Sequence, residues 1–364
     1  MRILFASGVD VGGAPKSTVE LARLLAQRGH EVAVIMGDAN PRGRMHPVLM
    51  KLAIKVRERT GWVWPRKLFL PFGRLPDPRT DSGPVKVWRT IYPAHALPHL
   101  LRSFQPDVVV ANSFWREPMR WIRADTETRG VPLALYMREE HSLTHLLVSG
   151  LAFDLVLANS QHLASQAEAA GYRSHFIPSI VDLSAVQVES TRHTLCLINP
   201  VPENRPEILK ALAARRPDIP VVLQSSWPLT PDWQQELASW ASEIPNLELR
   251  ARREHPADVY GDVRLLVATY PSGRPRVVLE AQYSGIPVVA TDQPALAEII
   301  GRGGLLVPLD ADDEEWVKAL ERAWDDRAGY GVMSDAAHEH ARRPEVTPAE
   351  ILTRLEEALE GVGS

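Results

Sequence analysis

The sequence predicts an α/β protein of two domains, each built on a parallel β-sheet. Short apolar runs of strand length alternate with amphipathic stretches of helix length, which is the pattern of repeated βα units. The alternation starts again after the polar stretch 178–193, so the two halves of the chain resemble each other. The length of 364 residues also favours two domains, because a single hydrophobic core stops growing at ~250 to 300 residues.

The individual elements follow from these runs and from the turn signals between them. In the first half we expect strands at 2–6, 31–36, 85–89, 107–111, 133–137 and 155–158, and helices at 14–28, 94–103, 117–129 and 161–170. In the second half we expect strands at 194–198, 221–224, 247–249 and 265–268, and helices at 206–214 and 232–241.

The domain boundary is expected in the stretch 178–193, which is polar and has no sustained apolar period. We therefore assign residues 1–180 to an N-terminal domain and 190–345 to a C-terminal domain. Residues 346–364 form a last amphipathic helix. Periodicity does not fix where this helix packs, and a return to the N-terminal domain is one option.

The composition is that of an ordinary globular protein, with 45% hydrophobic and 24% charged residues. A net charge of -4 gives no electrostatic footprint for nucleic acid, which we do not expect as a partner. No apolar run reaches the ~18 residues of a membrane span, and no signal peptide is apparent, so we expect a cytoplasmic protein. The single cysteine, Cys196, stands in an apolar run and predicts a buried structural thiol.

The segment 51–74 is an insertion between expected strands that combines seven basic residues with interleaved aromatic ones. One interpretation is a long surface loop packed by its own aromatic side chains. The other is a lid or interfacial segment for an anionic or lipid-linked molecule, which would allow peripheral contact with the inner face of a membrane. Both interpretations stay open at this stage.

Gly12 and Gly13 lie between the first expected strand and the first expected helix, where backbone N–H groups and the helix dipole converge on an anion. The loop is neither G-x-G-x-x-G nor a Walker loop, which argues against dinucleotide-binding proteins and P-loop NTPases. A purely structural turn would also use two glycines. The sequence alone therefore leaves the role of this loop open.

A second candidate anion site follows the expected strand 265–268, where a loop with Ser272, Gly273 and Arg276 leads into a helix that starts at Val277. Glu280 stands one turn inside this helix, and a carboxylate there can bind two neighbouring hydroxyl groups. Its apolar sequence neighbours favour a functional acid over a solvated one. An anion site beside a hydroxyl-binding acid fits a nucleoside diphosphate.

These blocks resemble the retaining glycosyltransferases of family 4, which have the GT-B fold, along nearly the full chain. The resemblance rests on Gly12-Gly13, on 28–32, on 157–160, on a P-x-x-V-D-like element at 176–182, on 199–203 and on 269–309. Residues 342–345 resemble one bacterial subgroup. The resemblance implies two Rossmann-like domains facing a central cleft. The N-terminal domain would serve the acceptor, and the C-terminal domain would bind a nucleotide-sugar donor.

The resemblance also implies roles for single residues, with three departures. Family members carry an E-x7-E motif whose second Glu holds the donor ribose and whose first holds the sugar; Glu280 matches the second, but Ser272 stands at the first. In place of an Arg and a Lys against the diphosphate, the loop after residue 198 has Pro200 at the Arg position and either Asn204 or Arg205 at the Lys position, and Arg205 is its only cation. A histidine common in the family is replaced by Arg138, with His141 as a second candidate.

Arginines at other positions would supply the positive charge that the family usually places against the diphosphate. The expected catalytic residues are Arg138, His141, Arg205 and Arg274, and the expected donor-binding residues are Gly12, Gly13, Asn199, Ser272, Gly273, Arg276, Val277 and Glu280.

No metal ligand and no cofactor are expected, because the sequence has no Asp-x-Asp at a strand end and no zinc-type spacing. The resemblance implies front-face attack, in which the leaving phosphate takes the proton of the acceptor. The acceptor itself stays open between a glycan, a natural product and a lipid-linked molecule. Two other functions stay open as well, a nucleotide-sugar epimerase and a non-catalytic nucleotide-sugar-binding protein.

Overall fold

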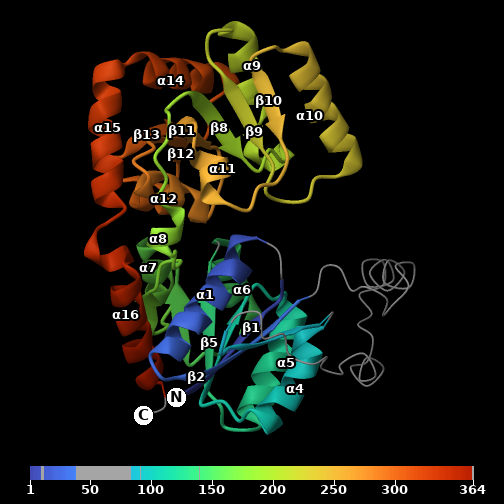
Figure 1. Ribbon diagram of the computed structural model, residues 1–364. Coiled ribbons are helices and arrows are strands. Elements are labelled where there is room, and N and C mark those ends of the chain that lie inside the picture. Colours follow the sequence, from blue (N-terminus) through green and yellow to red (C-terminus); the bar gives the residue numbers. More distant parts are fainter. Residues whose placement is uncertain (10–11, 38–82, 91, 139, 363–364) are drawn as a thin grey trace. The chain divides into compact units, whose positions relative to one another are not determined.

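The computed structural model describes residues 1–9, 12–37, 83–90, 92–138 and 140–362 (Figure 1). The chain divides into two compact units, and each is described by itself. Unit 1 comprises Met1–Asn159, Leu163–Ile177 and Leu352–Ser364, and unit 2 comprises Ser160–His162 and Pro178–Ile351. The expected insertion 51–74 lies outside the described residues.

Unit 1 contains a seven-stranded sheet in the order β3-β2-β1-β4-β5-β6-β7, with parallel pairing throughout. Its strands are β1 (Arg2–Ser7), β2 (Glu31–Met36), β3 (Lys86–Arg89), β4 (Val108–Asn112), β5 (Leu133–Met137), β6 (Leu155–Ala158) and β7 (Ser174–Phe176). Its helices are α1 (Gly13–Gln27), α4 (Pro93–Ser103), α5 (Arg116–Glu127), α6 (Glu140–Ser149) and α7 (Gln161–Ala169), the last of which begins in residues assigned to unit 2. The central strands are buried on both faces, as expected for a parallel sheet covered by helices.

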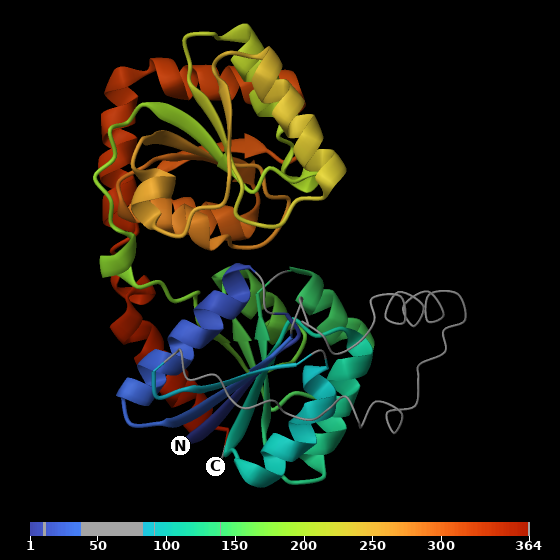
Figure 2. The same ribbon diagram turned by 45° about the vertical axis from the view of Figure 1, so that its right-hand side comes forward.

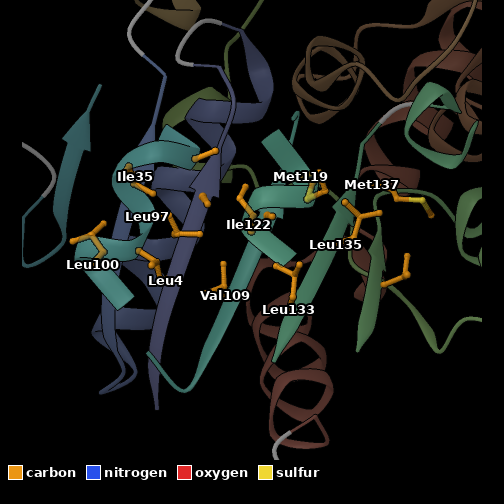
Figure 3. Close-up of a cluster of buried hydrophobic side chains, with 14 of the residues drawn as sticks. Leu4, Ile35, Leu97, Leu100, Val109, Met119, Ile122, Leu133, Leu135 and Met137 are labelled. Carbon is orange, nitrogen blue, oxygen red and sulfur yellow. The ribbon is translucent and has the colours of Figure 1, made fainter. Parts of the chain in front are cut away.

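One hydrophobic cluster fixes α4 and α5 against this sheet (Figure 3). Leu97 and Leu100 of α4 and Ile122 of α5 meet strand side chains such as Leu4 and Val109, all of them 1% exposed or less. Full burial of one such side chain is worth about 1.5 to 3 kcal/mol. The apolar periodicity of the two helices therefore sets which of their faces lies on the sheet.

The end of the chain belongs to unit 1 through α16 (Pro348–Glu360), drawn in red in Figure 1. Glu356 of this helix accepts a hydrogen bond from Arg28 at 2.6 Å and lies 3.0 Å from the ring nitrogen Nε2 of His30. Arg173 donates to the carbonyl oxygen of Gly361 at 2.6 Å. Residues from the first and last thirty positions of the chain therefore stabilise the same unit.

Unit 2 contains a six-stranded sheet in the order β10-β9-β8-β11-β12-β13, again with parallel pairing. Figure 2 shows that helices cover both faces of this sheet. Its strands are β8 (Thr194–Ile198), β9 (Val221–Gln224), β10 (Leu247–Arg250), β11 (Val263–Ala268), β12 (Val288–Asp292) and β13 (Gly304–Pro308). Its helices are α8 (Leu183–Val186), α9 (Glu207–Arg215), α10 (Pro231–Glu243), α11 (Pro256–Tyr260), α12 (Arg276–Tyr283), α13 (Pro294–Ile300), α14 (Asp313–Asp325) and α15 (Arg327–His340). One buried cluster joins the sheet to α9, α10 and α14, and another joins it to α11, α12 and α13.

The expected fold class is confirmed, because both units are helix-covered parallel sheets. The strands and helices expected in the two halves lie within two residues of the observed ones, and the last helix, assigned to 346–364, is observed at Pro348–Glu360. The sequence analysis did not name β7 and α6 in unit 1, nor β12, β13, α8, α11, α13, α14 and α15 in unit 2. Cys196 is fully buried on β8, and burial raises the pKa of its thiol to about 12, in agreement with an unreactive structural cysteine. None of the described helices combines the length and hydropathy that a membrane crossing requires.

Candidate functional site

The sheet of unit 2 reverses its strand order between β8 and β11. The loops after these two strands, together with the helix α12 that follows β11, carry most of the expected donor-binding residues. In open α/β sheets, ligands bind outside the carboxyl ends of the strands at such a switch point. Hydrogen bonds join the two loops. Thr269 donates to the carbonyl oxygen of Asn204, and the hydroxyl of Tyr270 donates to that of Ile198 at 3.1 Å.

The loop after β8 is shaped by two residues in the left-handed backbone conformation, Asn199 with φ 61° and Arg205 with φ 48°. Asn199 is buried, and its side-chain oxygen accepts a hydrogen bond from the backbone N–H of Trp227 at 2.9 Å. Its own carbonyl oxygen accepts from the side chain of Asn204 at 2.8 Å. Asn199 thus holds the loop in place at the edge where it was expected to bind the donor.

The loop after β11 turns sharply at Gly273, whose φ of 85° favours glycine. The side chain of Gln293, at the end of β12, donates to the carbonyl oxygen of Gly273 at 2.7 Å. Ser272 is exposed at the tip of this turn, whereas Arg274 is only 5% exposed. The turn therefore presents a hydroxyl group to solvent and buries a cation directly before α12.

The N-terminus of α12 has the features of an anion site. Within the described part of the chain, no side chain caps it and its first turn carries no acidic residue. Arg276 is its first residue and Val277 its second, both partly buried. Backbone N–H groups, the positive end of the helix dipole and two arginines thus stand at the switch point.

Glu280 lies one turn inside α12, as the sequence predicts, and its side chain is 16% exposed. Its Oε1 accepts a hydrogen bond from Nε of Arg276 at 2.6 Å, and its Oε2 accepts one from the hydroxyl of Tyr260 at 2.8 Å. Arg276 and Tyr260 therefore hold the Glu280 carboxylate through both of its oxygens, one turn after the start of α12.

Arg205 makes contacts that the sequence did not predict. Both of its terminal nitrogens donate to the carbonyl oxygen of Ala311 at 3.1 Å, and Nη2 also donates to Asp313 at 2.6 Å. Asp313 is the first residue of α14. In this arrangement the guanidinium of Arg205 joins the start of α14 rather than that of α12.

In unit 1, the expected glycines lie at the start of α1. Gly12 precedes the helix with φ 107° and ψ -171°, a backbone conformation essentially restricted to glycine, and Gly13 is the first helical residue. The first turn of α1 has no acidic residue and no side-chain cap within the described residues. Gly12 and Gly13 therefore stand at a helix start that has the features of an anion site.

Arg138 follows β5 and is 6% exposed. Its guanidinium lies 4.1 Å from the ring centroid of Tyr136 and donates to the hydroxyl of Thr18 on α1 at 3.4 Å. The side-chain amide of Asn159 donates to its carbonyl oxygen at 2.7 Å. Arg138 is thus fixed beside α1, and His141 is the second residue of α6.

A cavity of about 370 Å³ opens beside α1 in unit 1. Its lining combines apolar side chains with three cations and one acid: Pro15, Lys16, Val19, Glu20, Arg23, Met36 and Arg89. Its volume lies in the range of small-molecule sites. Among the described residues, no group of three or more His, Cys, Asp or Glu side chains is placed to hold a metal ion.

The fold is that of an α/β protein, with a helix start that no described side chain caps and a partly buried carboxylate at the topological switch point of unit 2. A family model described as Glycosyltransferase Family 4 matches residues 11–185, and one described as Glycosyl transferases group 1 matches residues 205–326. Together these ranges take in most of the chain, so the chain belongs to the family 4, group 1 glycosyltransferases. No curated protein sequence matches it.

Several solved structures share the fold over the whole chain. Sucrose-phosphate synthase from Thermosynechococcus elongatus has a TM-score of 0.76 at 15% identity, and the alignment covers 100% of this chain and 99% of that one. HepE from Anabaena, solved with UDP-glucose, has a TM-score of 0.72 at 17% identity and covers 99% and 100%. The pneumococcal O-GlcNAc transferase GtfA, solved with UDP and GlcNAc, has a TM-score of 0.68 at 11% identity and covers 99% of both chains.

The sequence analysis missed Tyr260 and the pairing of Arg276 with Glu280. The pairing has a signal, because residues four apart on a helix face each other. Tyr260 has none, since it ends a five-residue helix twenty positions before Glu280 and comes near it only through the fold of the sheet.

Proposed function

We propose that this glycosyltransferase moves a sugar from a nucleotide-sugar donor to an acceptor with retention of configuration and without a metal ion. The observation that carries the proposal is Glu280, whose carboxylate stands one turn behind the uncapped N-terminus of α12 at the switch point. A ribose binds through its hydroxyl groups to the carboxylate, and the diphosphate lies against the backbone N–H groups and dipole of α12. Structures of HepE with UDP-glucose and UDP support a nucleotide-sugar donor.

In the proposed reaction, the bond between the anomeric carbon and the diphosphate oxygen breaks, and a bond from the acceptor oxygen to the same face of that carbon forms. The acceptor proton passes to the leaving phosphate, so no protein nucleophile is required. The leaving group gains negative charge, and Arg274 and Arg276, which stand just before and at the start of α12, are the proposed cations that stabilise this charge. Arg205 and Arg138 have weaker support as catalytic residues, because Arg205 contacts α14 and Arg138 contacts α1. His141, the second residue of α6, stays a prediction from the sequence.

We further propose that unit 1 serves the acceptor, and that the cavity beside α1 receives part of it. Lys16, Arg23 and Arg89 around an apolar floor suit a molecule that has both a negatively charged and an apolar part. A lipid-linked or phosphorylated glycan has this chemistry. A cytoplasmic location, with contact to the inner face of a membrane, is consistent with such an acceptor.

The test is a screen of UDP, GDP and ADP by thermal shift, in buffer with and without EDTA. A bound ligand at 100 times its dissociation constant stabilises the protein by ~2.7 kcal/mol, which is easily detected as a higher unfolding temperature. We expect one nucleotide to stabilise the protein equally with and without EDTA. Stabilisation that requires manganese would contradict the metal-free mechanism.

The products then separate the three functions that the sequence left open. A transferase releases nucleoside diphosphate only when an acceptor is present, and anomeric analysis of the product by NMR reports retention or inversion. An epimerase interconverts two donors without an acceptor. A binding protein shows the thermal shift and no turnover, and either of these last results would overturn the proposed transfer.

A further inference from the structure

We infer that Tyr260 is a positioning residue for the donor site: its buried hydroxyl fixes the carboxylate of Glu280, so that the site selects the vicinal diol of a ribonucleotide. The inference rests on the proposed function, because it takes Glu280 as the group that binds the ribose. The inference adds Tyr260 to the donor site as a residue that acts through Glu280 and not by contact with the donor.

The first step is the environment of Tyr260, which is 2% exposed and is packed in the cluster between the sheet of unit 2 and α12. Burial and the nearby carboxylate of Glu280 raise the pKa of this phenol well above its usual value of 10.0. The hydroxyl therefore keeps its proton at any working pH and donates it to Oε2 of Glu280 at 2.8 Å. A buried ring has few alternative positions, so its hydroxyl marks a fixed point for the carboxylate.

The second step is the count of hydrogen-bonding positions on Glu280. An ionised carboxylate offers about four lone-pair positions, two on each oxygen. Tyr260 uses one on Oε2, and Arg276 uses one on Oε1. One position stays on each oxygen, which is the pattern that two neighbouring ribose hydroxyls require.

The third step is the direction from which the carboxylate is held. Tyr260 approaches from the buried cluster and Arg276 from the first turn of the same helix, and 16% of the Glu280 side chain is exposed. The orientation of the carboxylate is thus set before a ligand arrives. A site held in its binding orientation avoids the entropy loss of ordering a flexible side chain during binding.

The alternative explanation is that Tyr260 only stabilises the fold. The two explanations differ in the expected preference for a ligand with ribose hydroxyls over one without them. The experiment measures the dissociation constants of UDP and of 2′,3′-dideoxyuridine 5′-diphosphate by calorimetry for the full-length protein and for Tyr260→Phe. We expect the wild-type protein to prefer UDP. Tyr260→Phe should weaken UDP binding by about threefold to tenfold, the usual effect of one lost hydrogen bond, and leave the dideoxy ligand almost unchanged.

Tyr330→Phe is the matched control, because it also removes a hydroxyl group that donates to unit 2, here to the carbonyl oxygen of Arg264 at 3.1 Å. It should leave the preference for UDP unchanged. In a Glu280→Gln background, Tyr260→Phe should have no further effect on the preference, since the carboxylate that it positions is gone. Far-UV circular dichroism establishes that each variant is folded.

An unchanged preference in folded Tyr260→Phe overturns the role of Tyr260 and leaves the proposed function intact. An equal loss of affinity for both ligands also overturns it, because that is the result of a general structural effect. If the screen selects GDP or ADP instead of UDP, the same comparison is made with that nucleotide and its 2′,3′-dideoxy analogue. Failure of the wild-type protein to bind any of the three nucleotides overturns the proposed donor site, and the role of Tyr260 with it.

Discussion

Two helices of unit 2, α12 and α14, begin in opposite ways. Asp312 and Glu315 close the N-terminus of α14 with a reciprocal capping box, and its first turn carries three acids. α12 has no side-chain cap within the described residues, no acid in its first turn, and arginines at positions 274 and 276. In α14, acidic side chains of the chain itself stabilise the positive end of the helix dipole. In α12, Arg274 and Arg276 add positive charge at that end.

The difference accords with the proposed function, in which the start of α14 serves stability and the start of α12 serves binding. A helix that only has to be stable gains from a cap and from acids in its first turn. A helix that has to bind an anion is better left uncapped, since the ligand then takes the place of the cap. The same distinction separates Arg274, buried before α12, from Arg205, paired with Asp313 of α14.

The largest expected effect is the loss of nucleotide binding in Glu280→Ala. Each hydrogen bond to a charged group contributes about 1.5 to 3 kcal/mol, so the loss of two abolishes measurable affinity at ordinary ligand concentrations. Calorimetry with the nucleotide identified in the screen measures this. Glu236→Ala, an exposed acid of α10, is the control and should bind normally. Unchanged affinity in Glu280→Ala would place the ribose elsewhere.

The next largest effect is on the rate of Arg274→Ala. Removing one donor that stabilises developing charge typically costs ~2.7 to 4 kcal/mol in the barrier, or roughly a hundredfold to a thousandfold in kcat. Donor affinity in the ground state should fall much less. Arg205→Ala, and the exposed Arg322→Ala, should change kcat little. Equal rate losses in Arg205→Ala and Arg274→Ala would show that both helix starts serve the reaction.

A smaller effect is expected from Asp312→Ala, which removes the cap of α14. Loss of an N-cap carboxylate costs about 0.5 to 2 kcal/mol of stability. The unfolding temperature should fall while kcat and nucleotide affinity stay unchanged. A drop in nucleotide affinity would contradict the separation of the two helices.

The smallest effect is the coupling between Arg205 and Asp313. Their side chains are 34% and 56% exposed, and partly exposed ion pairs contribute ~0.2 to 1 kcal/mol. A double-mutant cycle of Arg205→Ala and Asp313→Ala, followed by urea unfolding, measures this coupling. A coupling free energy of zero would mean that Asp313 does not hold Arg205, and Arg205 would again be a candidate for binding the diphosphate.

The sequence predicts the fold well because apolar periodicity is a local signal. Runs such as residues 194–198 are strands wherever a sheet can bury them, and β8 is observed at those residues. The strand β7 was missed because its three residues, only partly buried, carry no apolar run. Its position depends on pairing with β6, which is a long-range contact.

The candidate site is predictable only where it lies within one element. Glu280 could be placed one turn into a helix, because the loop and the helix are continuous in sequence. The contact of Tyr260 with Glu280 and that of Arg205 with Asp313 join residues 20 and 108 positions apart. Such contacts are set by strand order and loop shape, and the charge or hydroxyl group alone does not reveal its partner.

The position of α16 has a consequence for how the protein is made. Unit 1 contains Met1–Asn159, which precede most of unit 2 in the sequence, and also Leu352–Ser364, which follow it. The contacts of Arg28 and His30 with Glu356 can form only after more than three hundred intervening residues have been synthesised. Domains generally fold as they emerge, but here the unit that starts first is completed after unit 2 has been synthesised. Deletion of the residues from 352 onward would therefore impair folding around Arg28 and His30, far in sequence from the deleted segment.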